Sequence, residues 1–329
     1  MKEKMQSATA AMVKTDIKQQ KGNRFKRYFS RLNKDLRKNP GMYLMSLPAF
    51  VLIFIFSYIP MVGVLMAFQD YTVAGGIFGS QWIGLFNFEL FFSSYYFSEV
   101  LFNTLAISLY SLMVGFTFPI LFALVLNSVK IKFVKAGMKV LSYIPYFIST
   151  VIIVSLLKSF FDPSYGVVNV FLESLGLQSV DFMNEPRFFR SLFVWSDLWQ
   201  SMGWSSIIYI SVLGGVSREL YDAAEVDGAN KLRVLVHIDF PALLPTIIML
   251  GILAIGGILG VAFEKIYLMQ SGLNLSVSEV ISTYVYKIGV VGQDYGFGAA
   301  VGLFNSVIGF ILLCIANILC RKFTEYSLW

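Results

Sequence analysis

The sequence predicts an all-α polytopic membrane protein with six transmembrane helices. Of its 329 residues, 57% are hydrophobic and 14% are charged, and its mean hydropathy is +0.69. Soluble domains average about 45–50% apolar and about 25% charged residues. Six apolar runs have roughly the 20 residues that a helix needs to cross a bilayer. They are residues 43–68, 104–126, 140–161, 188–213, 247–263 and 299–319.

The fourth run is the most polar of the six, because Asp197, Gln200 and two serines interrupt it. Polar groups at membrane depth usually face protein or water rather than lipid. We therefore expect the polar side of this helix to face the interior of the protein.

The basic residues predict the orientation, because cytoplasmic flanks of membrane helices are enriched in Lys and Arg. Residues 1–38 hold 12 of the 26 basic residues. If this end is cytoplasmic, six spans place 21 of the 26 on the same side, whereas five or seven spans would break this agreement. The sequence thus predicts six spans with both termini in the cytoplasm of a bacterial cell.

The chain is expected to have two parts, a basic cytoplasmic tail at residues 1–40 and a transmembrane domain at residues 41–329. Within the tail, apolar residues recur at helical spacing between basic ones from 25 to 36, which is typical of an interfacial helix on the inner leaflet. Attraction to anionic lipid accounts for this charge, so the pI of about 9.1 does not indicate nucleic-acid binding.

A polar segment at residues 217–245, SRELYDAAEVDGANKLRVLVHIDFPALLP, lies between two apolar runs. Residues 218–227 favour a helix, and Gly228 can adopt the left-handed conformation that ends one. A second helix can start at residue 231, and Pro241 and Pro245 are expected to end it before the next span. The segment is predicted to be a helix-turn-helix elbow on the cytoplasmic side, with small and apolar residues that suit docking to a partner.

This segment resembles the coupling loop of ABC-importer permeases, whose pattern is Glu-Ala-Ala, Gly, Ile and Leu-Pro. The matching residues are Asp222-Ala223-Ala224, Gly228, Ile238 and Phe240-Pro241. Segments at 263–269, 280–286 and 295–302 are similar to the carbohydrate-uptake, maltose-type branch. The closing residues 321–329 resemble the subgroup named for the permeases LplB and YteP. The resemblance covers nearly the whole chain from about residue 40.

The resemblance implies a type I ABC-importer permease fold that works by alternating access. A second homologous permease would complete the channel, two ATPase subunits would dock inside, and an extracytoplasmic sugar-binding protein would deliver an oligosaccharide, such as a fragment of pectin or another polysaccharide. ATP and Mg would be used by the ATPases, and this chain would bind no cofactor. The residues implied in coupling to the ATPase are Leu220, Asp222, Ala223, Ala224, Glu225, Gly228, Ile238 and Pro241.

Residues that could line the sugar path are aromatic or hydrogen-bonding groups near membrane depth. The candidates are Trp195, Trp199, Gln200, Trp204, Glu264 and Asn305. For each of them an interhelical contact or an interfacial anchor is the alternative, and Glu264 could pair with the adjacent Lys265. Four glycines, Gly256, Gly260, Gly298 and Gly302, are interpreted as close contacts between helices.

The chain is not expected to be an enzyme or to bind a metal. Its one histidine, His237, cannot build a His-paired zinc site or a Ser-His-Asp triad, and no P-loop pattern occurs. Two other classes stay open. An ion-coupled secondary sugar transporter would carry ionisable or unwound elements within its spans, and a membrane enzyme acting on lipid-linked sugars would need a carboxylate cluster beside a span. Co-purification with an ATP-hydrolysing subunit would separate these classes from an ABC permease.

Overall fold

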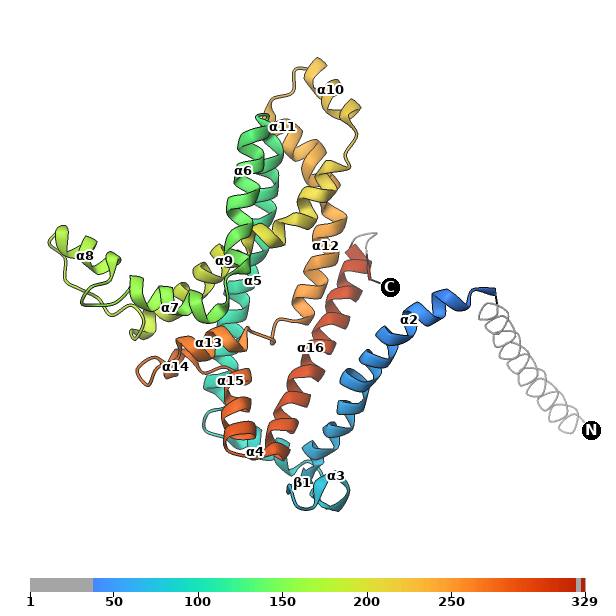
Figure 1. Ribbon diagram of the computed structural model, residues 1–329, viewed down its shortest axis with the longest axis vertical. Helices are drawn as coiled ribbons and strands as arrows, with labels where there is room; N and C mark the ends of the chain where they lie inside the picture. Colours follow the sequence, from blue (N-terminus) through green and yellow to red (C-terminus); the bar gives the residue numbers. More distant parts are fainter. Residues whose placement is uncertain (1–37, 324–326, 329) are drawn as a thin grey trace, which may run out of the picture. The chain divides into compact units, whose positions relative to one another are not determined.

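A computed structural model describes residues 38–323 and 327–328 of the chain (Figure 1). The interfacial helix predicted at residues 25–36 lies outside this part of the chain. The chain divides into two compact units, residues 1–63 and 64–329. Each unit is described by itself.

The described part of the first unit is one apolar helical stretch. Helix α2 (Pro40–Ile53) starts with a proline in its first turn, where the missing N–H costs no helical hydrogen bond. It continues through the π-helix η1 (Phe54–Tyr58) into the 3-10 helix η2 (Ile59–Phe68). The stretch Pro40–Phe68 has 29 residues, the last five of which belong to the second unit, and it corresponds to the first predicted span.

The second unit is almost wholly helical in the described residues. Two strands of two residues each, β1 (Gln69–Asp70) and β2 (Gln81–Trp82), pair antiparallel near its start. The helices up to the elbow are α3 (Gly76–Gly79), α4 (Phe86–Ser93), α5 (Phe97–Ser128), α6 (Lys132–Tyr143), η3 (Ile144–Phe147), α7 (Thr150–Phe160), α8 (Val167–Ser174) and α9 (Pro186–Gly214). The remaining helices are α10 (Arg218–Val226), α11 (Lys231–Val234), η4 (Leu235–Asp239), α12 (Phe240–Gly256), α13 (Phe263–Met269), α14 (Leu275–Ser278), α15 (Ile281–Val285), η5 (Tyr286–Val291) and α16 (Tyr295–Phe323).

Long helices that pack lengthwise form the frame of this unit. Helix α5 runs along α9, and α12 runs along α16. One apolar cluster joins α5, α7, α9 and α13, a second joins α5, α9 and α12, and a third joins α4, α5, α15 and α16. Figure 1 places α10 at one end of these helices and α4 at the other. The elbow and the opposite loops are therefore connected through continuous helices.

Four helical stretches of the described chain are long and apolar enough to cross a membrane, namely Pro40–Phe68, Phe97–Ser128, Lys231–Gly256 and Tyr295–Lys322. A fifth candidate is the pair Lys132–Phe147 and Thr150–Phe160, which is bent by 98°. The sequence predicted a single run at 140–161 there. Pro145 lies in the first turn of the short helix η3 and Ser149 caps α7, so the chain turns although its composition stays apolar. Helix α9 has 29 residues but falls short of the same apolar standard.

The predicted end of the elbow and the predicted fifth span are both wrong in their boundaries. Pro241 and Pro245 do not end a helix, because Lys231–Gly256 is one continuous helical stretch. The π-helix η4 runs directly into α12, in which Pro241 is the second residue and Pro245 lies inside the helix. The helix therefore continues through both prolines, with its hydrogen-bond pattern changing from π to α just before Pro241. The helix then ends at Gly256 instead of reaching residue 263.

Close helix contacts occur at some of the predicted glycines. A Cβ atom on Gly256 would lie 2.6 Å from Leu313, and one on Gly298 would lie 2.8 Å from Gly289, so both contacts are confirmed. Gly302 has nothing within 4 Å, and the nearest atom to Gly260 belongs to its own loop at 3.2 Å, so these two predictions are wrong.

The tightest approach of two helices lies at a glycine that the sequence did not single out. A Cβ atom on Gly203 of α9 would lie 2.1 Å from the Ser142 carbonyl oxygen of α6. Only a residue without a side chain allows α6 and α9 this separation.

Candidate functional site

The elbow forms as predicted, because each of its turns has a local hydrogen-bond signal. The Ser217 hydroxyl accepts the Glu219 N–H at 3.3 Å and caps α10. Gly228 has φ of +69°, and the next N–H, of Ala229, donates to Ala224 at 2.9 Å, which is the pattern of a glycine-terminated helix. The Asn230 side chain then accepts the Arg233 N–H at 2.9 Å and caps α11.

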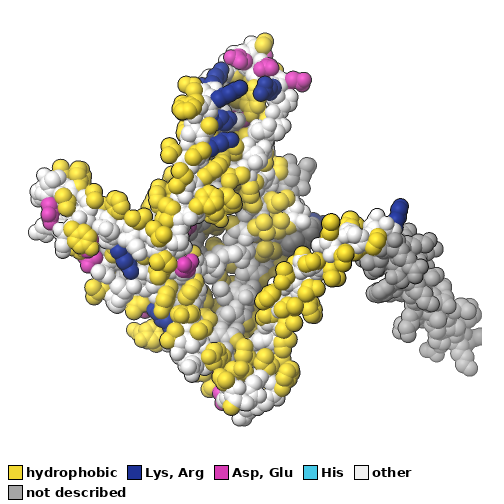
Figure 2. Space-filling view, viewed as in Figure 1, with side chains coloured by type: hydrophobic (Ala, Val, Ile, Leu, Met, Phe, Trp, Pro, Cys, Tyr) yellow, Lys and Arg dark blue, Asp and Glu magenta, His cyan; other side chains and the backbone are white. Residues whose placement is uncertain are grey.

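Most of the predicted coupling residues lie on the surface of this elbow. Leu220, Asp222, Ala223 and Glu225 are exposed, whereas Ala224 is half-buried. Further along, Ile238 is half-buried in η4 and Pro241 is exposed at the start of α12. Figure 2 shows Lys, Arg, Asp and Glu side chains gathered at the end of the unit that carries α10, while apolar side chains cover much of the helices below it. This end therefore offers a mixed polar and apolar surface to a partner.

A buried hydrogen-bonded cluster lies beneath the elbow. The Asp239 side chain is 4% exposed, and its Oδ1 accepts the Tyr221 hydroxyl at 2.6 Å and the Asn127 amide at 3.1 Å. Burial, followed by the hydrogen bond to Asp239, raises the pKa of Tyr221 to about 12. Sequence reasoning missed this cluster, although the acidic residue in the apolar run VLVHIDFPALL was a signal, since a buried carboxylate needs partners.

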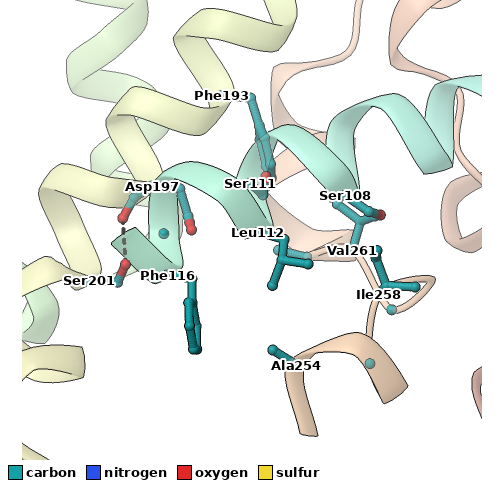
Figure 3. A pocket seen from close by; sticks show the side chains of 14 residues that line it. Ser108, Ser111, Leu112, Phe116, Phe193, Asp197, Ser201, Ala254, Ile258 and Val261 are labelled. Carbon is teal, nitrogen blue, oxygen red and sulfur yellow. Dashed lines mark hydrogen bonds between the residues drawn. The ribbon is translucent and has the colours of Figure 1, made fainter. Parts of the chain in front are cut away.

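A cavity of about 320 Å³ lies between α5, α9 and the segment after α12 (Figure 3). Ser108 and Ser111 face it from α5, Asp197 and Ser201 from α9, and Val261 from the loop after α12. The hydroxyl oxygens of Ser108 and Ser111 are buried without a hydrogen-bond partner. The cavity thus combines unpaired hydroxyl groups and a carboxylate with the apolar faces of neighbouring side chains.

Asp197 at the edge of this cavity holds a buried lysine. The Lys265 Nζ atom lies 3.3 Å from Asp197 Oδ1, with the lysine side chain 2% exposed and the aspartate 42% exposed. The ammonium also lies 5.6 Å from the centre of the Phe193 ring. The alternative of a Glu264–Lys265 pair is wrong, because Lys265 turns inward to Asp197 while Glu264 is exposed on α13.

None of the six predicted sugar-path residues lines the cavity in Figure 3. Glu264 is exposed on α13, and the other five lie around other hollows or contact neighbouring elements. Trp195 and Trp199 line a second, mainly apolar hollow of about 430 Å³ beside α7. The Trp195 N–H donates to the Tyr110 hydroxyl at 2.8 Å. Both tryptophans have about half of their surface exposed.

The other three have contacts with neighbouring elements. The Gln200 amide donates to the Ile148 carbonyl at 3.0 Å, at the bend between η3 and α7. Trp204 stacks on Tyr146 with ring centres 4.5 Å apart. Asn305 donates weakly to the Leu259 carbonyl at 3.5 Å, and its own carbonyl oxygen is buried without a partner.

Comparison with known protein families identifies relatives for most of the chain. Residues 115–325 match the family described as "Binding-protein-dependent transport system inner membrane component". Protein LplB of Bacillus subtilis (strain 168) is 38% identical over 89% of this chain and 92% of its own length. The polygalacturonan/rhamnogalacturonan transport system permease protein YteP of the same organism is 39% identical over 88% of this chain and 90% of its own length.

A solved structure is similar to this chain in both fold and sequence. It is a chain from the crystal structure of a bacterial alginate ABC transporter in complex with an alginate pentasaccharide-bound periplasmic protein. This chain is 36% identical to it, with a TM-score of 0.82 over 90% of this chain and 99% of the solved one. The similarity therefore extends over nearly the whole solved chain.

Proposed function

Since this chain belongs to the family of binding-protein-dependent transport system inner membrane components and is an ABC-importer permease subunit, we propose that it imports oligosaccharides derived from polysaccharides. The observation that carries this proposal is the exposed elbow of α10 and α11, joined directly to a membrane-length helix. An importer of this kind needs such a surface, because ATP is hydrolysed by separate subunits. The chain itself is not an enzyme.

The proposed substrate class is supported by the relatives and by the cavity. YteP is named for polygalacturonan and rhamnogalacturonan transport, and the solved relative for alginate. The cavity of about 320 Å³ has the size of a small-molecule site, for which about 300–1,000 Å³ is usual. Its unpaired serine hydroxyls and the Asp197 carboxylate can hydrogen-bond to sugar hydroxyls, while Phe116 and Phe193 offer apolar faces to sugar C–H groups.

The proposed topology has six spans with both termini in the cytoplasm. Helix α9 supplies the span that falls short in apolarity. Its 29 residues would measure about 43 Å at 1.5 Å per residue, longer than the roughly 30 Å hydrocarbon core. Three polar residues in its middle are turned inward, because Asp197 and Ser201 face the cavity and Ser206 is fully buried. A helix with a hidden polar face can cross a membrane despite its modest average hydropathy.

The proposed mechanism is alternating access driven by two partner ATPases. They would dock on Leu220, Asp222, Ala223 and Glu225, while Ala224 and Gly228 give α10 its packing and its turn and Ile238 and Pro241 lead into α12. A second homologous permease would complete the channel, and an extracytoplasmic sugar-binding protein would deliver the substrate. ATP and Mg would be bound by the ATPases.

The test is purification of the chain with its partners from the native membrane, followed by reconstitution in vesicles. We expect a nucleotide-hydrolysing subunit to co-purify with the chain. ATP enclosed in the vesicles should then drive uptake of oligogalacturonides that are added outside together with the sugar-binding protein. The isolated chain should neither hydrolyse ATP nor transport. Uptake by the isolated chain under an ion gradient would instead show a secondary transporter, and sugar-lipid turnover would show a membrane enzyme.

A further inference from the structure

We propose that the cluster of Tyr221, Asp239 and Asn127 fixes the coupling helix α10 to the ends of α5 and α12, so that all three move as one body when the ATPases close. These are positioning residues, because they lie beneath the surface on which an ATPase would dock. The inference rests on the proposed docking of ATPases to α10. It adds the route by which movement of that helix reaches the membrane helices.

Three separate elements meet at one carboxylate oxygen. Tyr221 comes from α10, Asp239 from the π-helix that opens into α12, and Asn127 from the last turn of α5. Besides its bond to Asp239, the Asn127 amide lies 3.3 Å from the Tyr221 hydroxyl. Each of the three side chains therefore contacts both others. A closed set of charge-assisted hydrogen bonds holds its members in one geometry better than separate pairs do.

The rest of α10 is loosely attached to the described fold. Tyr221 and Ala224, three residues apart on one face, are the only residues of this helix that are not exposed. A second polar link of α10 joins Glu225 to Lys130 at 3.9 Å, and its two side chains are 80% and 82% exposed. Exposed pairs contribute little because water and salt screen them. A carboxylate that is 4% exposed loses far more when a partner is removed.

A hollow beside the cluster leaves few other contacts through which a movement of α10 could reach α5. It measures about 560 Å³ and is lined by residues of α5, α10, α11 and η4, among them Ser128, Ala229 and Leu232. Tyr221 and Asp239 form part of its wall. Because this space separates the elbow from the end of α5, close side-chain packing does not bridge them there. The hydrogen-bonded cluster is the firm connection.

The tyrosine is suited to a connection that must persist. A tyrosine hydroxyl with the ordinary pKa of about 10 is already protonated at neutral pH, and burial raises the pKa of Tyr221 further, to about 12, so the hydroxyl donates to the carboxylate across the physiological range. Phenylalanine in its place would keep the ring in the same space and remove only the donor. Tyr221→Phe is therefore a sharper variant than a truncation to alanine.

The experiment measures whether α10 and α5 move together in the assembled transporter with both ATPases. Spin labels are placed on cysteines that replace the exposed residues Val226 of α10 and Val125 of α5, in a chain whose Cys314 and Cys320 are changed to alanine. The distance between the labels is measured without nucleotide and with MgATP plus orthovanadate. We expect one narrow distance, equal in both states, for the otherwise unchanged chain.

Tyr221→Phe should keep this distance without nucleotide and add a second, longer distance with MgATP and orthovanadate. Lys130→Gln is the matched control, because it removes the exposed link between the same parts of the chain and should leave one distance in both states. If Tyr221→Phe does not accumulate in the membrane as a folded chain, Asn127→Ala removes the other donor and should give the same second distance.

Three results would overturn the proposal. They are a label distance that already changes with nucleotide in the unchanged chain, a single distance in both states for Tyr221→Phe, and loss of ATPase co-purification from Tyr221→Phe, which would place the residue in the docking surface. Failure of the proposed function would look different, because the unchanged chain would then not assemble with an ATPase at all.

Discussion

Changing Asp197 to asparagine is expected to destabilise the protein more than changing its partner Lys265 to methionine. The lysine side chain is 2% exposed and the aspartate is 42% exposed. Asp197→Asn therefore leaves an ammonium group in a buried place without a counter-charge. Removing one member of a buried pair in this way costs about 3–5 kcal/mol.

Two features of the site reduce that cost. The Phe193 ring, 5.6 Å from the ammonium, retains a cation–π attraction of about 1 kcal/mol, and an asparagine oxygen can still accept a hydrogen bond. We therefore expect a net loss of about 2–4 kcal/mol for Asp197→Asn. Lys265→Met leaves a carboxylate that water already reaches, so it should cost about 1 kcal/mol. The double variant should lie close to Lys265→Met, because it contains no unpaired charge.

The assay is the melting temperature of the purified transporter in one detergent, measured for both single variants and the double variant. With about 2 °C per kcal/mol for a large chain, Asp197→Asn should melt roughly 4–8 °C lower. The order of the variants is the decisive result. If Lys265→Met proves less stable than Asp197→Asn, the difference in exposure between the two side chains does not set the cost, and the reasoning is refuted.

Three further predictions follow from backbone geometry and from one titrating group. Gly203→Ala should destabilise the folded protein by about 1–3 kcal/mol, because its Cβ would meet the Ser142 carbonyl at 2.1 Å. Gly302→Ala is the control, since it has nothing within 4 Å and should leave the melting temperature unchanged or raise it. Equal melting temperatures for the two variants would contradict this. Gly228 has φ of +69°, so Gly228→Val should strain the elbow by about 1–2 kcal/mol. It should lower transport-coupled ATP hydrolysis without preventing membrane insertion, and unchanged coupling in vesicles would count against a docking role. The pKa of Tyr221 is raised to about 12 from an unfolded value of about 10, so the folded state holds its proton longer. The stability difference between the unchanged chain and Tyr221→Phe should be full below pH 10 and fade as pH rises toward 12, and a difference that stays constant across that range would be inconsistent with this titration.

The elbow could be predicted from the sequence because its signals are local. Gly228 was expected to end the first helix, and the structure places it in that turn. Ser217 and Asn230 cap the two helices, and although the sequence analysis did not single them out, they too are signals within a few residues of each helix start. The path beyond the elbow was not predictable in the same way. Proline was expected to end the second helix, but the helix continues from a π-helical turn before Pro241 through Pro245 inside α12.

Apolar composition predicted how much of the chain belongs in a membrane, but it did not predict where the apolar helices bend or which way their faces point. The third apolar run turns by 98°, since Pro145 and Ser149 provide local breaks that an average over 20 residues conceals. Helix α9 shows the opposite case. Its average is lowered by serines and Asp197, and only the neighbouring helix α5 reveals that these residues face a cavity.

The cavity could not be assigned from the sequence because helical spacing gives relative faces only. Asp197 and Ser201 are four residues apart and share one face of α9, while Trp195 and Trp199, also four apart, share another. The tryptophans suggested a sugar path on chemical grounds. The structure places the first pair at the cavity in Figure 3 and the second pair at the hollow beside α7. The Asp197–Lys265 pair likewise joins residues of α9 and α13 that no local pattern connects.

The stretch Lys231–Gly256 links the two parts of the proposed site physically. Its 26 residues measure about 39 Å as a helix, with Asp239 of the buried cluster near one end and Ala254 at the cavity near the other. Beyond Gly256 the chain leaves the helix, and α13 is held separately through Lys265. In the proposed mechanism, a displacement of α10 would be carried along this helical stretch to the cavity wall and would stop where the helix ends at Gly256. In that mechanism, the helix that follows the elbow has to run through its two prolines, because an interruption there would disconnect the elbow from the cavity.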